Sequence, residues 1–396
     1  MNKSKTYKVL HIGKYHPPFM GGIENFMADL MMQQVADGYN VSAIVHHHQK
    51  GKSYVEEVDK GVKIFRVPCF GQLAYAPISP SFGLYLNKII KEQQPEILHL
   101  HMPNLSAFWC LLLASAMKIP WVIHWHADVI GSVPDMKIKL LYPFYRFFES
   151  RLLKQTQKII ATSPVYLSSS LPLQKYKKKT QIIPLGLSQY GAKVSVDETS
   201  NIGCEKDDVL KLLMVGRLTY YKGHSLIIEA IARLKSQGKT LKLNIVGTGE
   251  LLNEIESDIE KFGLIQDVHL LGKLSDEDLV SEMQQCDLLC LPSIERTEAF
   301  GVVLLEAMRE SKACLVSDVP GSGMSWVVKQ DETGFVVKHG DVDDLVAKLT
   351  DILNNMHLLD DYAIAGFQRF SKQFSIEQVS HRVSSLYREL HSDRIF

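Results

Sequence analysis

Glu298 and Glu306 belong to a stretch in which a carboxylate interrupts an apolar run. Glu306 stands within GVVLLEAM, which predicts a helix that begins near Gly301 and is buried on all sides. A charge in such a helix is costly unless it is hydrogen-bonded, so Glu306 needs a partner. A carboxylate can accept two hydroxyl groups at once, as in a ribose; an ion pair with an internal Arg or Lys is the alternative. Glu298 comes eight residues before Glu306 and does not share its helical face, so it would reach another part of a ligand.

A second stretch, VGRLTYYKGHS, carries Arg217 and Lys222 on one loop ahead of a predicted helix. Arg offers a fork of donors and Lys a point charge, so two cations at a helix start would bind a diphosphate. The glycines of VGTGEL, Gly247 and Gly249, invite a dinucleotide-binding interpretation. That motif lacks its third glycine and does not follow the chain's first strand, so nicotinamide binding is disfavoured.

A third stretch, YHPPFMGGIENF, carries Gly21 and Gly22 before a helix predicted to begin near Ile23. Glycines let a backbone approach a phosphate or a sugar closely, and a helix start offers N–H donors. A tight turn alone would also explain the two glycines. The histidine triplet at 46–48 lacks neighbouring carboxylates, so we interpret it as structural or exposed rather than as a metal site.

The elements that must position these loops are short apolar strands alternating with amphipathic helices, twice along the chain. The expected strands are YKVLHIG, NVSAIVHH, ILHLH, WVIHWH and KIIATS, then LKLLMVG, LKLNIVG, VHLLG, DLLCLPS and ACLVSD. Strands that are apolar on both faces predict parallel sheets covered on both sides, and therefore an α/β protein with two Rossmann-like domains. Ligands of such sheets bind at the carboxyl ends of the strands, where these loops stand. The polar stretch at 188–208 has the composition of a linker.

The charges balance overall but are unevenly distributed. Residues 1–186 hold 22 of the 44 Lys and Arg but 11 of the 44 Asp and Glu, and residues 136–186 hold ten cations against one acid, Glu149. Cations interleaved with the aromatics of LLYPFYRFF favour an anionic partner such as a lipid surface; a solvated helix face is the alternative. The sequence shows no bilayer-spanning stretch, no signal peptide and no paired cysteine spacing. We therefore expect a cytoplasmic protein, peripheral at the inner face of the cytoplasmic membrane.

Together these stretches resemble the retaining glycosyltransferases of family 4, which have the GT-B fold. The resemblance rests on GGIE, GRLTYYKG and LPSIERTEAFGVVLLEAM with its E-x7-E spacing, and on their order, and it covers nearly the whole chain. It implies two Rossmann-like domains facing across a deep cleft: 1–187 for the acceptor and 188–375 for the nucleotide sugar. A C-terminal helix in 376–396 would cross back to the N-terminal domain. Many members carry an acidic residue where this chain has IIPLGLS, so the role of Leu187 and Ser188 is open.

The resemblance also implies roles for single residues on both sides of the reaction. His126, in HWHADV, would lie close to the transferred sugar, with Asp128 on the acceptor side; a core histidine is the alternative for His126. Donor binding would involve Glu306 on the ribose, Arg217 and Lys222 on the diphosphate, Gly21 and Gly22 over the phosphates, and Glu298, Phe300, Gly301 and Val302 on the sugar or its phosphates. Of these, Glu298, Arg217, Lys222 and His126 would be catalytic.

The implied reaction moves a hexosyl unit from a nucleotide sugar to a hydroxyl group, with retention at the anomeric carbon. Cations and the helix start would stabilise the departing diphosphate, so we expect no metal and no cofactor. The D-x-D match at Asp341 to Asp343 is interpreted as helix capping. PGSGMSWV resembles transferases of O-antigen and capsule assembly, which favours GDP-mannose, with UDP-hexoses open, and a cell-surface glycan or lipid-linked acceptor rather than nucleic acid. A non-catalytic nucleotide-sugar-binding protein and a GT-B epimerase are the alternatives.

Overall fold

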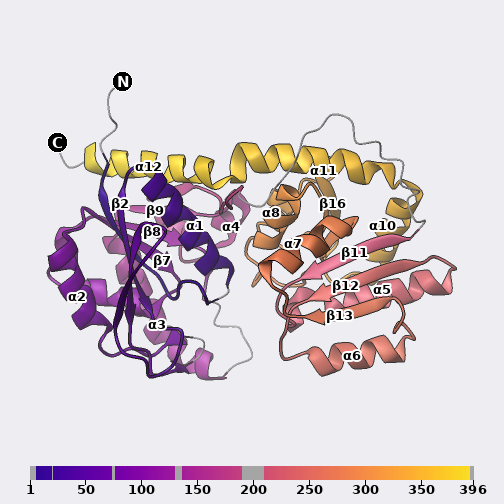
Figure 1. Ribbon diagram of the computed structural model, residues 1–396, viewed down its shortest axis with the longest axis horizontal. Helices are drawn as coiled ribbons and strands as arrows, with labels where there is room; N and C mark the ends of the chain where they lie inside the picture. Colours follow the sequence, from indigo (N-terminus) through magenta and orange to yellow (C-terminus); the bar gives the residue numbers. More distant parts are fainter. Residues whose placement is uncertain (1–5, 20, 74–75, 130–135, 190–208, 393–396) are drawn as a thin grey trace. The chain divides into compact units, whose positions relative to one another are not determined.

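The computed structural model describes residues 6–19, 21–73, 76–129, 136–189 and 209–392, with backbone alone for 73, 136–139 and 392. The chain divides into two α/β units: Met1–Ser188 with Ile376–Phe396, and Gln189–Ser375. Each unit is built on its own sheet (Figure 1). Most of the expected linker, together with Cys204, lies outside the described residues.

The sheet of the first unit has eight strands in the order β10-β9-β8-β7-β1-β2-β4-β3. All neighbouring strands pair in parallel except β3 and β4. The strands are β1 (Lys8–Ile12), β2 (Asn40–His46), β3 (Val55–Asp59), β4 (Val62–Val67), β7 (Ile97–Met102), β8 (Trp121–Trp125), β9 (Lys158–Ala161) and β10 (Thr180–Ile182), with a separate hairpin of β5 (Gln72–Leu73) and β6 (Ala76–Pro77).

Helices cover both faces of this sheet. On one face α1 and α12 lie side by side (Figure 1), and Gln34 of α1 and Tyr387 of α12 share a hydrogen bond above the strands. On the other face the ring of Phe82 of α2 lies 4.8 Å from that of His46, whose Nε2 is 2.8 Å from Oγ of Ser106 in η1. The helices are α1 (Gly22–Ala36), α2 (Phe82–Gln93), η1 (Leu105–Leu111), η2 (Ala116–Lys118), α3 (Met136–Gln155), α4 (Pro164–Ser169), η3 (Gln174–Lys179) and α12 (Ile376–Ser392).

The sheet of the second unit has six parallel strands in the order β13-β12-β11-β14-β15-β16. From β11 the chain adds strands to one side, then returns to add β14 on the other side. The loops after β11 and β14 therefore diverge at a topological switch point, where ligands of parallel sheets bind. The strands are β11 (Leu210–Val215), β12 (Leu241–Val246), β13 (Val268–Gly272), β14 (Leu288–Leu291), β15 (Ala313–Ser317) and β16 (Gly334–Val337).

The core of the second unit joins alternate strand residues to the apolar stripes of α5, α6 and α10. α7, α8 and α9 contact the strands outside this core. Asp341 caps α10 by accepting from the N–H of Asp344, which confirms the capping interpretation of the D-x-D match. The helices are η4 (Tyr220–Lys222), α5 (His224–Ser236), α6 (Leu252–Lys261), α7 (Asp276–Gln285), α8 (Val302–Arg309), α9 (Met324–Val327), α10 (Val342–Asn354), α11 (His357–Arg369) and the π-helix η5 (Phe370–Phe374).

Candidate active site

The loops after β11 and β14 bring Lys222 and Glu298 together at the switch point of the second sheet. Nζ of Lys222 lies 2.6 Å from Oε2 of Glu298, and the two side chains are only 11% and 13% exposed. Burial lowers the pKa of Lys222, but the carboxylate of Glu298 and, more weakly, that of Glu306 outweigh this effect, so the pKa is raised. The site therefore holds a cation that is largely shielded from water, where its field on a ligand is strong.

Glycines allow these loops to pack closely. A Cβ on Gly216 would lie 3.0 Å from Nζ of Lys222, one on Gly247 would lie 1.8 Å from the carbonyl oxygen of Gly216, and one on Gly249 would lie 2.1 Å from that of Leu218. The glycines of VGTGEL thus let the loop after β12 pack on the loop after β11. This packing explains them without dinucleotide binding.

The loop that carries Glu298 is held by residues that sequence reasoning did not single out. The hydroxyl of Ser322 donates to the carbonyl oxygen of Glu298 at 2.5 Å, and the N–H of Gly323 donates to Ala299 at 2.8 Å. The hydroxyl of Tyr220 donates to Glu295 at 2.6 Å. Ser322 and Gly323 belong to PGSGMSWV, where the cluster of small residues was a signal for a tightly packed loop.

Helix α8 is not buried on all sides, so that expectation was wrong. Leu304, Leu305, Ala307 and Met308 are buried, but Val302, Val303, Glu306 and Arg309 are partly exposed. The helix has eight residues and covers the sheet with one stripe, so its apolar run extends beyond the stripe that faces the core. A carboxylate at 306 therefore does not need a buried partner, and its charge acts on the nearby cation of Lys222.

Other predicted donor residues differ in what they can offer. Arg217 is 58% exposed and lies 3.8 Å from Glu250. The ring of Phe300 is buried near Trp326 and Phe374, which leaves its backbone as the part that can face a ligand. Gly301 is the N-cap of α8 and has the left-handed conformation, with φ of 79°. In the first unit, α1 begins at Gly22 rather than Ile23.

Gly21 packs against the side chain of Glu24. A Cβ on Gly21 would lie 2.3 Å from Oε2 of Glu24, whose side chain is buried. Burial raises the pKa of Glu24, opposed by a hydrogen bond from its own backbone N–H. Gly21 therefore has a packing role, and the phosphate-binding role of Gly21 and Gly22 stays a prediction.

His126 and Asp128 both follow β8, but their side chains make different contacts. His126 is 3% exposed, with Nε2 3.0 Å from Nδ1 of His101, and Phe26 of α1 lies edge-on to its ring. Oδ1 of Asp128 accepts from Nε1 of Trp125 at 2.8 Å and from Oγ of Ser170 at 2.7 Å. Asp128 thus braces the loop that carries His126, while its contact with an acceptor stays a prediction.

Sequence reasoning missed the histidines around His126. His11, His99 and His101 are fully buried on β1 and β7, next to His124 of β8. The signal was present, because ILHLH and WVIHWH carry histidines at alternate positions, which share one face of a strand. The triplet at 46–48 is separate from this row: His46 bonds to Lys14 and Ser106, which confirms a structural role for that residue.

Two family models match the chain, one on each unit. Residues 21–186 match the model described as "Glycosyl transferase 4-like domain", and residues 196–369 match "Glycosyl transferases group 1". The chain is 29% identical over 385 residues to "O-antigen chain mannosyltransferase C" of Escherichia coli, covering 97% of this chain and 98% of that protein. It is 32% identical over 262 residues to "D-rhamnosyltransferase WbpZ" of Pseudomonas aeruginosa, covering 65% of each.

Solved structures of low sequence identity share the fold. Sucrose-phosphate synthase from Thermosynechococcus elongatus superposes with a TM-score of 0.79 at 20% identity, over 98% of this chain and 100% of that one. WaaG, a glycosyltransferase involved in lipopolysaccharide biosynthesis, gives 0.69 at 21% identity, over 96% and 99%. Within the described residues no helix combines the length and apolar character needed to cross a membrane.

Proposed function

Because the chain belongs to the GT-B glycosyltransferases of the family 4 type, we propose that it transfers a mannosyl unit from GDP-mannose, with retention, to a hydroxyl of a bacterial surface glycan. Similarity over almost the full length to an O-antigen mannosyltransferase supports the donor and acceptor class. The observation that carries the chemistry is the shielded ion pair of Lys222 and Glu298 at the switch point of the donor unit.

In this proposal, charged groups of the second unit bind the donor and stabilise the leaving diphosphate. Lys222 is held as a cation by two carboxylates, and it meets the negative charge that develops on the leaving diphosphate. Arg217 adds a fork of donors, and the amides at the start of α8 face the phosphates or the sugar. Glu298 would accept from hydroxyls of the sugar, and Glu306 from those of the ribose. A phosphate oxygen of the leaving group would take the acceptor's proton, so the reaction needs no enzyme nucleophile.

The donor is tested by binding and then by turnover. A ligand that binds the folded state raises the melting temperature by mass action, so GDP-mannose should raise it more than UDP-glucose or UDP-galactose at equal concentration. We then expect the enzyme to transfer or slowly hydrolyse the donor that raises the melting temperature most. If the configuration is retained, NMR should show an α-anomeric product. Binding without transfer or hydrolysis would favour the non-catalytic alternative.

Metal independence is part of the proposal, and it has its own test. We expect turnover to be unchanged after dialysis against EDTA, because Lys222, Arg217 and the helix start supply the positive charge that a divalent ion would otherwise provide. Loss of activity that magnesium or manganese restores would contradict this expectation.

The first unit supports a peripheral membrane location for a lipid-linked acceptor. Helix α3 packs Tyr145 and Phe148 against Phe108 of η1, yet Leu140 and Phe144 are 80% and 69% exposed. Apolar residues one helical turn apart beside a basic stretch are typical of a helix that lies in a membrane interface. The acceptor would then reach the enzyme from the membrane surface.

A further inference from the structure

Five histidines form a row on one face of the first sheet, beneath α1 and α12. His11 of β1 is in register with His99 of β7, His101 of β7 is in register with His124 of β8, and His126 continues the row. Each is at most 3% exposed. Ring planes of neighbours differ by between 2° and 27°. A row of buried imidazoles can share protons only through defined hydrogen bonds, so the proton on each nitrogen can be worked out.

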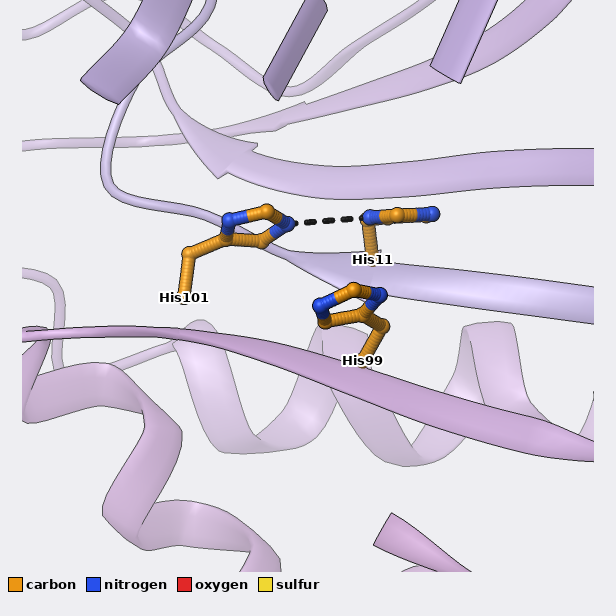
Figure 2. A group of neighbouring side chains, drawn as sticks. All are labelled: His11, His99 and His101. Atoms are coloured by element: carbon orange, nitrogen blue, oxygen red, sulfur yellow. Dashed lines mark hydrogen bonds between the residues drawn. The ribbon is translucent and has the colours of Figure 1, made fainter. Parts of the chain in front are cut away.

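A chain of hydrogen bonds runs from α1 through this row to His126. Oε1 of Gln34 lies 2.8 Å from Nε2 of His11. Nδ1 of His11 lies 3.0 Å from Nε2 of His101, and Figure 2 draws this hydrogen bond as a dashed line. Nδ1 of His101 lies 3.0 Å from Nε2 of His126. The far nitrogen, Nδ1 of His126, is buried and has no hydrogen-bond partner among the described residues.

Tyr387 of α12 sets the direction of this chain. Its Oη is 2.5 Å from Nδ1 of His99 and 3.2 Å from Nε2 of Gln34. The shorter distance is typical of an O–H donor and the longer one of an N–H donor. The hydroxyl therefore donates to His99 and accepts from the amide of Gln34. This arrangement turns the carbonyl oxygen of Gln34 toward His11, because the amide cannot present both groups to one side.

The protons follow step by step from that orientation. A carbonyl oxygen only accepts, so Nε2 of His11 carries its proton and Nδ1 is bare. Burial lowers the pKa of His11 to about 4 and that of His126 to about 3, and holds that of His101 well below its usual value, so all three are neutral near pH 7. His101 must then donate from Nε2 to His11, and His126 must donate from Nε2 to His101. Nδ1 of His126 is left with a lone pair.

We propose that Gln34 and Tyr387 are positioning residues that hold His126 in its Nε2–H tautomer, so that Nδ1 accepts a hydrogen bond from a hydroxyl of the sugar ligand. The position of His126 near the sugar rests on the proposed function; the tautomer does not. The device links α12, at the end of the chain, to the loop after β8. A reversed chain would put a proton on Nδ1 of His126, and that nitrogen would then repel a donating hydroxyl.

Nuclear magnetic resonance of protein labelled with ¹⁵N in histidine tests the tautomer directly. We expect the wild type to show a protonated Nε2 and a bare Nδ1 for His126, its signals being assigned by their loss in His126→Asn. Gln34→Met removes both the donor and the acceptor, so the two directions become comparable and the Nε2–H fraction should fall toward half. Gln34→Glu keeps an acceptor opposite His11, so it should retain the Nε2–H form. A wild-type Nδ1–H tautomer, or an unchanged tautomer in Gln34→Met, would overturn the proposal.

Turnover of the donor tests the catalytic consequence. Tyr387→Phe keeps the ring and frees the amide of Gln34, so kcat/KM should fall roughly two- to ten-fold, in proportion to the fraction of competent tautomer. Tyr39→Phe is the matched control. The ring of Tyr39 lies 6.2 Å from that of Tyr387, and Tyr39 takes no part in the series of hydrogen bonds that leads to His126. Equal losses in both variants, despite a changed tautomer in Tyr387→Phe, would overturn the role in positioning a ligand.

The two tests separate the failure of this inference from that of the proposed function. If no donor is turned over, the hydrogen-bond series from Gln34 to His126 can still be tested, because the tautomer of His126 can be compared between the wild type, Gln34→Met and Gln34→Glu. A metal is the competing occupant, because nitrogens of His11, His99 and His101 lie within 4.8 Å of one another. A metal held by these histidines would compete with the hydrogen bond that Figure 2 draws between His11 and His101, because a nitrogen that binds a metal has no lone pair left to accept a proton. Stoichiometric metal in the purified protein would therefore overturn the proposal.

Discussion

Single carboxylates carry the proposed recognition of the donor, and Glu306 is the clearest case. It is partly exposed on α8, and in the proposed function it accepts from two ribose hydroxyls. We expect Glu306→Ala to weaken binding of the nucleoside diphosphate by roughly 2 to 4 kcal/mol, because hydrogen bonds to a charged group are lost. Calorimetric titration with the 2′-deoxy analogue is the matched control. The wild type should bind the analogue more weakly than the ribonucleotide, and the variant should not distinguish the two; a variant that still distinguishes them would exclude Glu306 as the ribose ligand.

The ion pair of Lys222 and Glu298 requires that stability and catalysis be measured separately. Lys222→Met leaves the carboxylate of Glu298 shielded and unpaired, so we expect a loss of about 3 kcal/mol in the free energy of unfolding. The double variant with Glu298→Gln should recover most of that loss. Turnover should fall about 100-fold or more in both, because the charge on the leaving group is missing.

Denaturation in urea and kcat on the same three proteins provide the measurement. If the double variant regained turnover together with stability, the lysine would be a structural residue rather than a catalytic one. If it were no more stable than Lys222→Met, the two charges would not depend on each other.

At the scale of elements, glycines decide how closely the loops of the second sheet can pack. Gly223 precedes α5 with φ of 78°, and a Cβ there would lie 2.1 Å from the carbonyl oxygen of Pro292. Gly238 has a φ of 77° with nothing within 4 Å of the added atom. Alanine at Gly238 should therefore cost about 1 kcal/mol from backbone strain alone, and alanine at Gly223 roughly 3 kcal/mol or more, because the backbone of the loop after β14 must also move. Equal losses of stability would show that the contact with Pro292 is not limiting.

The strands that sequence predicted best are those buried on both faces. ILHLH and WVIHWH form β7 and β8 because apolar runs bounded by loops have few other ways to bury both faces. The hairpin of β3 and β4 was not foreseen, since VEEVD sets two adjacent acids between a partly exposed and an exposed valine at the edge of the sheet. β16 was not among the predicted strands.

The candidate site was predicted residue by residue, but not as an arrangement. Residue chemistry pointed separately to Lys222 and Glu298, whereas their contact depends on β11 lying beside β14, which no local pattern encodes. The chain of His11, His101 and His126 needs the order of three strands in the same way. The burial of α8 was overestimated because an apolar run does not reveal which of its residues face the core.

At the scale of the whole molecule, the uneven charge distribution is the reason for proposing different partners for the two units. The first unit carries the excess of cations, as expected of a surface that meets anionic lipid, and the second unit carries the ion pair proposed to act on the donor. Of the basic residues near α3, Lys179 has a separate structural role, because its Nζ donates to the carbonyl oxygens of Lys154 and Thr156 at the end of that helix. A test of lipid binding should therefore leave Lys179 in place.

Changing Lys175, Lys177 and Lys178 together to Ser should weaken binding to vesicles that contain anionic phospholipid. Each exposed cation near such a surface contributes about 1 kcal/mol, so the partition coefficient should fall on the order of 100-fold. Serine at Lys211, Lys261 and Lys273, exposed in the second unit, is the control with the same change in net charge.

Salt should weaken wild-type binding, since screening shortens the reach of these charges to about 8 Å at physiological ionic strength. Phe144→Ser should weaken it further, because an inserted ring contributes apolar contact that salt does not screen. Sedimentation with vesicles at low and high salt measures the electrostatic and the apolar contribution to binding. Equal binding by all these proteins would mean that the basic stretch is a solvated face.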